Sequence, residues 1–207
     1  MPAFWQIFSL VIMALLDQHC ISAHGAVVYP PEASVHNGTL YAVCKVKPNE
    51  PTDAGPKVYG MVLFKQDSPE SKLSVFLQLR GFDSDTAETK AVHIHQYGDL
   101  IPNCASTGGH YNPYNVNHPQ HPGDFGNFIT QNGRIKTMFE SEATLFGGDS
   151  VIGRAVVVHQ HQDDMGRGGD ASSLLNGNAG PRVGCCVIGI TSADLWTKHT
   201  TNPPTVN

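Results

Sequence analysis

The feature that most constrains the fold of this chain is a series of short apolar segments of strand length, each ended by Gly, Pro or polar residues. They cover residues 40–48, 57–66, 73–82, 91–98, 134–146, 151–160 and 182–191, and 134–146 has room for two strands. Val, Ile, Leu and Phe dominate them, and several alternate apolar with polar residues. No long segment shows helical periodicity with caps. The pattern predicts an all-β domain, an antiparallel sandwich or flattened barrel of about eight strands.

Two long segments, residues 99–133 and 161–181, interrupt these strands. Both are rich in Gly, Pro and Asn, and neither shows a strand pattern. Loops of this length in a compact domain are usually functional or disordered. The first one concentrates side chains that bind metals, so we expect both to be functional loops.

The N-terminus predicts secretion. Residues 4–16 are apolar and small residues follow near Ala23, the layout of a secretory signal, although no Lys or Arg precedes the apolar run. We therefore expect a signal at 1–23, a short extension at 24–39, one domain at 40–192 and a polar tail at 193–207. An uncleaved anchor or a buried helix is the alternative for the apolar run, which is short for a membrane span. No other segment could cross a bilayer.

Cysteine usage agrees with secretion. The chain has five cysteines, and loss of Cys20 with the signal would leave an even number, as a disulfide framework requires. Those that remain are Cys44, Cys104, Cys185 and Cys186, which allow three pairings. A bridge between the adjacent Cys185 and Cys186 would be strained. Either remaining choice places one bridge on Cys44 and another on Cys104, and both stay open at this point.

Two smaller features bear on the surroundings of the protein. Asn37 in "NGT" is an N-glycosylation acceptor, which a secreted protein can use. The formal net charge of −5 argues against nucleic acids and anionic membranes as partners.

The histidines suggest metal chemistry. In "AVHIHQYGD", residues 91–99, a strand would point His93 and His95 to the same face. His159 ends the run "AVVVH" and could point into the same space. These rings with one more imidazole would offer four nitrogens, which suit Cu(II).

A second set of ligand-type side chains falls in the first long loop. It consists of His110, His118, His121 and Asp124, and "PG" makes a tight turn between the last two. Three nitrogens and one carboxylate oxygen suit a closed zinc site. Only His110 lies where it could serve both sets, so we expect its ring to bridge two cations as imidazolate. Two interlocking sets argue against scattered core or surface histidines.

The motifs resemble a known family. "HIHQYGD", "GGHYNP", "HPQHPGDFGN", "GRAVVVH", "DDMGRGGD" and "GNAGPRVGCCVIGI" are similar to the copper/zinc superoxide dismutases, over residues 41–190. "YAVCKVKP" and the doubled Cys185–Cys186 resemble the secreted, extracellular branch. The resemblance implies a Greek-key sandwich and a secreted enzyme that converts superoxide to dioxygen and hydrogen peroxide. Copper would be reduced and oxidised in turn, with one copper and one zinc ion per subunit.

The resemblance also implies a role for each site residue. Copper would bind His93, His95, His110 and His159, and zinc would bind His110, His118, His121 and Asp124. Asp163 would join a copper histidine to a zinc histidine by hydrogen bonds, with Asp164 beside it as a solvated acid. Arg182 would guide the substrate anion, and His110 would supply a proton to the departing peroxide.

Disulfides and partners follow in the same way. The resemblance implies a Cys104–Cys185 bridge with Cys44 then paired to Cys186, and the swap Cys44–Cys185 stays open. It also implies a homodimer or a larger homo-oligomer. The tail "TSADLWTKHTTNPPTVN" has a single lysine, so it does not favour heparin or matrix binding.

Two other functions are considered. A non-catalytic extracellular protein on the same fold could hold metal without turnover, and a copper-delivery domain could pass copper to another protein. The first should have lost a copper ligand or Arg182. The second should lack a copper ligand and carry a cysteine-based transfer motif. This sequence meets neither condition.

Overall fold

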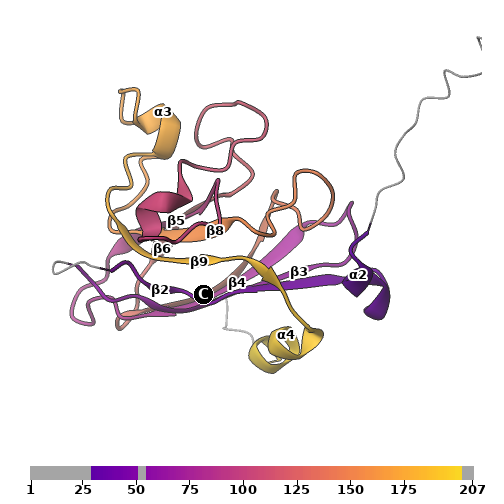
Figure 1. Cartoon of the computed structure of the whole chain (residues 1–207). Helices are drawn as coiled ribbons and strands as arrows, with labels where there is room; N and C mark the ends of the chain where they lie inside the picture. The colour runs from indigo at the N-terminus through magenta and orange to yellow at the C-terminus, as the bar shows by residue number, and fades with distance from the viewer. Residues whose placement is uncertain (1–28, 51–54, 202–207) are drawn as a thin grey trace, which may run out of the picture.

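Two five-stranded antiparallel sheets form a sandwich (Figure 1). The computed structural model describes residues 29–50 and 55–201, so the expected signal at 1–23 lies outside the described residues. In spatial order, the first sheet contains β10 (Gly189–Ile190), β1 (Leu40–Cys44), β3 (Tyr59–Gln66), β4 (Leu73–Arg80) and β7 (Arg134–Ser141). The second contains β2 (Lys47–Pro48), β9 (Arg182–Val187), β8 (Ala155–His159), β5 (Thr89–His95) and β6 (Asp124–Ile129).

The expected antiparallel sandwich is confirmed. β2 and β10 are two-residue strands at places where the chain crosses from one sheet to the other, which explains why the sequence suggested about eight strands. After β4 the chain builds β5 and β6 in the second sheet and then returns as β7 to pair with β4. This long return is the connection of a Greek key.

One part of the sequence prediction was wrong. Residues 99–133 were expected to hold no strand, yet β6 occupies Asp124–Ile129 and pairs with β5. The sequence "DFGNFI" has little alternation because β6 is an edge strand with mostly half-exposed side chains. Residues 134–146 form one strand, β7, that ends at Ser141, rather than two.

Short helices lie outside the sandwich. They are α2 (Pro31–Val35), the 3-10 turn η1 (Cys104–Thr107), α3 (Ser173–Asn176) and α4 (Ala193–Thr200). α3 sits in the second long loop, above the β5–β8–β9 side, and α4 lies on the other side (Figure 1). The segment expected as a polar tail therefore includes a helix. Within the described residues, no helix is both long and apolar enough to span a membrane.

The central strands of the second sheet are buried on both faces. In β5, Val92 and Ile94 join the core between the sheets, as do Val156 and Val158 of β8. The alternate residues point the other way, since successive side chains of a strand face opposite sides. That outer face is covered by the long loops, so every residue of β8 is buried. Polar side chains on it must therefore find partners there.

Candidate metal centre

Three histidines project from the outer face of β5 and β8. His93 and His95 lie on β5, and His159 ends β8, its antiparallel neighbour. His95 Nε2 lies 3.2 Å from His159 Nε2, and the ring centroids of His93 and His159 are 5.0 Å apart. All three rings are buried. The sequence prediction that His93 and His95 share a face agrees with this geometry.

His110 joins this group from the first long loop. The loop passes beside the end of β5, where Tyr111 N donates to Ile94 O at 2.9 Å. The backbone of His110 pairs there with that of His95 as an isolated antiparallel β-bridge. The His110 ring lies 4.2 Å, centroid to centroid, from the His93 ring. Its Nδ1 points away from this group, to Asp124 Oδ1 at 2.9 Å.

A second group converges on Asp124, the first residue of β6. The Nδ1 atoms of His118 and His121 lie 2.9 Å and 3.0 Å from Asp124 Oδ2, while His110 Nδ1 faces Oδ1. The "PG" segment makes the expected turn, since Asp124 N donates to His121 O at 3.1 Å. One carboxylate thus faces three imidazole nitrogens in a buried site.

Each group can hold one cation. Possible ligand atoms of His93, His95, His110 and His159 lie within 4.8 Å of one another, as do those of His110, His118, His121 and Asp124. His93 Nδ1 and His110 Nε2 are buried without a hydrogen-bond partner. An unsatisfied buried nitrogen is costly in a folded protein unless it binds something. The residues present therefore fit a metal in each group, with His110 belonging to both.

Asp163 ties the two groups together. Its carboxylate faces His93 Nε2 at 3.0 Å and His118 Nε2 at 2.8 Å, and its side chain is fully buried. Both contacts use the ring nitrogen that does not face the metal groups. Asn127 fixes the backbone on each side of the Asp163 Cα, accepting from Asp163 N and donating to Asp163 O. Asp163 therefore fixes the tautomer and orientation of one ring in each group.

The histidines of the two groups differ in the direction in which their pKa values are shifted. Burial lowers the pKa of His110 to about 4 and, together with the nearby rings, that of His159 to about 3. Burial and the charges of His110 and His159 also lower the pKa of His95 well below its ordinary value. These imidazoles are neutral near pH 7, the state in which they bind metals.

His118 is different. Burial acts against its charged form, but hydrogen bonds to Asp124 and Asp163 raise the pKa of His118 to about 9. Burial acts against the charged form of both carboxylates too. Hydrogen bonds with His110, His118 and His121 nevertheless hold the pKa of Asp124 below its usual range, and those with His118 and His93 do the same for Asp163.

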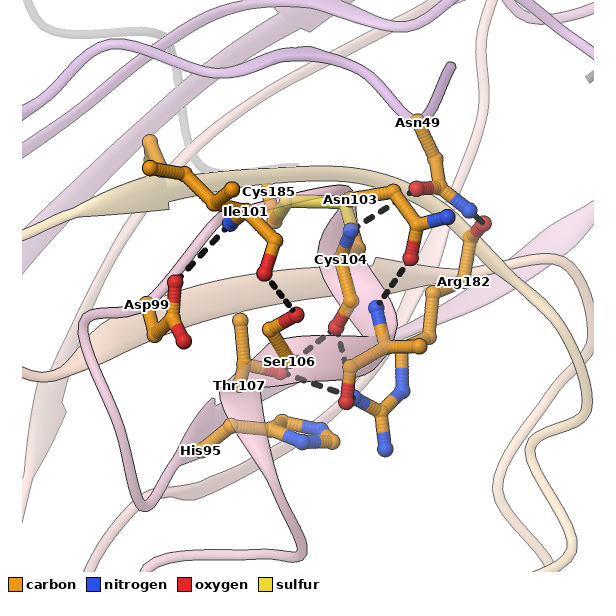
Figure 2. The surroundings of a disulfide bond; sticks show 12 residues. Asn49, His95, Asp99, Ile101, Asn103, Cys104, Ser106, Thr107, Arg182 and Cys185 are labelled. Atoms are coloured by element: carbon orange, nitrogen blue, oxygen red, sulfur yellow. Dashed lines mark hydrogen bonds between the residues drawn. A yellow bond between two sulfur atoms is a disulfide. The ribbon is translucent and has the colours of Figure 1, made fainter. Parts of the chain in front are cut away.

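Arg182 lies beside the first group, at the start of β9. Its guanidinium donates to Cys104 O at 2.6 Å and to Thr107 Oγ1 at 2.8 Å (Figure 2). It also donates to Gly108 O at 2.7 Å. The carbonyl of Gly108 also faces His95 Nδ1 at 2.9 Å, so it links the two side chains. The positive charge of Arg182 is close enough to contribute to the lowered pKa values of His95 and His159.

Two disulfides fix the surrounding segments. Cys104–Cys185 connects η1 to β9, and Cys44–Cys186 connects β1 to the next residue of β9. Neighbouring residues of a strand point to opposite faces, so Cys186 joins the core and Cys185 faces the loop side. The pairing is thus the one that the resemblance implied, and the swap Cys44–Cys185 does not occur.

Other site residues were not found from the sequence. Asn49 donates through Nδ2 to Arg182 O at 3.0 Å and accepts from Cys104 N at 2.9 Å. Gly177 has φ +64°, and a Cβ there would lie 1.9 Å from Asp163 Oδ1 and 2.6 Å from His118 Nε2. Only glycine fits this close approach.

Asp164, expected as a solvated acid, is partly exposed and is also hydrogen-bonded within the loop. It accepts hydrogen bonds from Ser173 Oγ at 2.7 Å, Gly166 N at 3.0 Å and Asn178 Nδ2 at 2.8 Å. It therefore organises the second long loop around α3.

Asn37 is exposed in the turn after α2, where a glycan would have room.

Comparisons with known proteins agree with this geometry. Residues 58–188 match the family model for copper/zinc superoxide dismutase. The chain is 50% identical to an extracellular superoxide dismutase [Cu-Zn] of Oryctolagus cuniculus over 165 residues, which are 78% of this chain and 68% of the relative. It is 48% identical to that of Homo sapiens, over 79% of this chain and 69% of the relative. A superoxide dismutase [Cu-Zn] of Saccharomyces cerevisiae is 43% identical over 68% of this chain and 94% of the relative.

Proposed function

The chain belongs to the copper/zinc superoxide dismutase family, and we propose that it acts outside the cell. It is an oxidoreductase that converts superoxide to dioxygen and hydrogen peroxide, and its cofactors are copper and zinc. The observation that carries the mechanism is the position of His110, whose ring has one nitrogen in each metal group.

We assign copper to His93, His95, His110 and His159, because four imidazole nitrogens suit Cu(II). We assign zinc to His110, His118, His121 and Asp124, because three nitrogens and one carboxylate oxygen suit a tetrahedral zinc site. Copper supplies the one-electron chemistry when bound, whereas zinc has no redox chemistry.

Protein side chains would orient the substrate and transfer the proton. Arg182 is a permanent cation next to His95, and its planar guanidinium can orient a small anion there. His110 Nε2, which has no hydrogen-bond partner, is the atom that would take up a proton and donate it to peroxide. The other nitrogen of that ring, Nδ1, lies in the proposed zinc group beside Asp124, so the ring would stay in place while this happens.

The extracellular location rests on several features. The relatives above are named extracellular, and two disulfides are typical of proteins from oxidising compartments. We infer a secretory signal at residues 1–23, cleaved near Ala23, and a glycan on the exposed Asn37. We also infer a homodimer or larger homo-oligomer, without nucleic acid partners and without matrix binding through the residue 193–207 tail.

Metal analysis combined with a superoxide-consumption assay on the purified secreted protein tests this function. We expect one copper and one zinc per chain and catalytic consumption of superoxide. His95→Ala should lose copper and activity, whereas His161→Ala, which removes an exposed imidazole outside both groups, should keep them. Full metal content without turnover would instead support a non-catalytic metal-binding protein.

A further inference from the structure

A cavity of about 700 Å³ lies away from the metal centre. It forms where the bend between β1 and β2 meets the ends of β3, β4 and β7, and His199 of α4 lies beside it. None of the residues that line it belongs to the copper or zinc group. The proposed reaction gives this cavity no role.

The cavity is strongly basic. It is lined by Lys45, Lys47, Arg80, Arg134 and Lys136, all of them exposed, and among the described residues Glu50 is its single acidic lining residue. The whole chain has 13 Lys and Arg residues and a net charge of −5. Positive charge is therefore concentrated at this cavity although the chain as a whole is negative. Within the described residues, none of the five cations takes part in an ion pair.

Two of the cations face each other directly. Arg80 of β4 is the cross-strand partner of Arg134 of β7, and Lys136 lies opposite Gln78 two residues further along β7. Like charges directly opposite one another destabilise a sheet. The repulsion would be relieved by an anion bound between them, since no carboxylate of the described residues forms an ion pair with either arginine.

The remaining lining is largely apolar, with Gln78 and His199 as its polar members. Pro48, Tyr59 and Met61 contribute to it, and Tyr59 is 43% exposed. The volume falls in the range of small-molecule sites, about 300–1,000 Å³. A polymeric anion would need a long row of cations and would leave these apolar side chains unused. We propose that this cavity binds a small amphipathic organic anion, with an aromatic or alkyl body and a sulfonate, sulfate or carboxylate group.

Binding of 8-anilinonaphthalene-1-sulfonate to the full secreted protein tests the proposal, followed by fluorescence and by equilibrium dialysis. We expect one site per chain. The double variant Arg80→Gln/Arg134→Gln should weaken binding at least about tenfold, because bidentate charge-assisted contacts are lost. The control double variant Lys72→Gln/Arg167→Gln changes the net charge equally but lies outside the cavity, so it should bind as the parent does.

Three outcomes would overturn the proposal. They are several weak sites per chain, an equal loss in both double variants, and displacement of the probe by a sulfated oligosaccharide that binds the same residues more tightly. Thermal unfolding checks that the cavity variant folds, and we expect it to be at least as stable as the parent because a like-charge pair is gone. The single variant Lys136→Gln provides a second test of the same cavity.

A second inference, which rests on the proposed function, concerns Asn49. Its side chain lies between Cys104 and Arg182 (Figure 2). It accepts from the backbone N–H of Cys104 and donates to the backbone carbonyl of Arg182, and the Arg182 guanidinium in turn donates to the Cys104 carbonyl. The backbone of Asn49 adds a third link, because its N–H donates to Val183 O at 3.1 Å. We infer that Asn49 is a positioning residue that fixes Arg182 against the disulfide loop.

A double-mutant cycle separates positioning from a general structural role. Asn49→Ala should weaken azide binding to the metal-loaded protein severalfold, as measured by visible absorption, and should have no further effect in an Arg182→Ala background. In the metal-free protein it should also speed reduction of Cys104–Cys185, measured by thiol trapping. Equal loss of azide affinity in both backgrounds would overturn the inference. These readouts do not depend on turnover, so they stay informative if the protein proves inactive.

Discussion

At the scale of single residues, the centre depends on which nitrogen of each ring is occupied. Asp163 takes one nitrogen of His93 and one of His118, which leaves the other nitrogen of each ring for a metal. Partners of this kind set the tautomer of a ligand before the metal arrives. A single carboxylate therefore organises both metal groups, although it belongs to neither proposed ligand set.

Replacing Asp163 by Asn should weaken zinc binding. The amide cannot accept from both rings, so His93 and His118 lose their fixed orientation, and zinc affinity should fall by about 10–100-fold. A competition titration against a chelator measures this. Asp164→Asn is the control, because that carboxylate contacts Ser173, Gly166 and Asn178 but no ligand histidine. Equal affinities of parent and Asp163→Asn would contradict the assigned role.

Zinc binding should also depend on pH through His118. The pKa of this ring is raised to about 9, so near neutrality it carries a proton that must leave before Nδ1 can bind a metal. The apparent zinc affinity of the metal-free protein should therefore rise about tenfold per pH unit between pH 7 and 8. Calorimetry in buffers of different ionisation enthalpy would count the released proton. A pH-independent affinity would show that His118 is already neutral.

At the scale of elements, the disulfides attach the first long loop and the N-terminal strand to β9. Cys104–Cys185 spans 81 residues and Cys44–Cys186 spans 142. Because η1 also supplies two carbonyls that hold Arg182, the first bridge supports the position of this side chain, which we propose guides the substrate, as well as the fold.

Removal of the Cys104–Cys185 bridge should destabilise the metal-free protein. For a loop of this length, the chain-entropy estimate is a loss of about 4.5 kcal/mol in the free energy of unfolding. Denaturant unfolding of the Cys104→Ala/Cys185→Ala variant measures it, with Cys44→Ala/Cys186→Ala as the comparison. An unchanged free energy of unfolding would mean that the bridge does not constrain the unfolded chain.

The elements also show what the sequence could predict. The apolar segments predicted most strands, because burial of the core leaves a period-2 pattern such as that of β1. β6 was missed because its partner β5 and the loop contacts, rather than its own apolar pattern, hold it in the sheet. Asn49 was missed for a related reason, since its partners Cys104 and Arg182 are distant in sequence and an isolated Asn carries no pattern.

The grouping of the candidate metal-binding residues was easier to predict. His93 and His95 follow from strand geometry, and the turn from His121 to Asp124 follows from "PG". That His110 belongs to the same site as His159 of β8 could be expected only from ligand chemistry and from the family resemblance. Its position depends on how the loop passes beside β5, which no local pattern encodes.

At the scale of the whole molecule, the protein is an anion that must attract an anion. With a net charge of −5, long-range forces repel a superoxide anion, so in our proposal the attraction comes from Arg182, which lies beside the proposed copper ligand His95. Local attraction of this kind is screened by salt less completely than interactions across the surface.

Arg182 should therefore control the effect of salt on the rate. In the parent protein, we expect the rate to fall as ionic strength rises from about 0.01 to about 0.15 M, because the Debye length shrinks. Arg182→Ala should lower the rate on the order of tenfold, about 1.4 kcal/mol. In this variant the remaining net charge should make the rate rise with salt. A rate that rises with salt in the parent would show that net charge dominates, and an unchanged rate at low salt in Arg182→Ala would reject its role.

The central claim is that the His110 imidazole contacts two different metal ions. Diffraction data collected on the metal-loaded protein at the copper and zinc absorption edges test it directly. We expect a copper peak about 2 Å from Nε2, the nitrogen that faces His93 and His95, and a zinc peak about 2 Å from Nδ1, the nitrogen that faces Asp124. A single peak at this ring, or copper on the Asp124 side, would contradict the account.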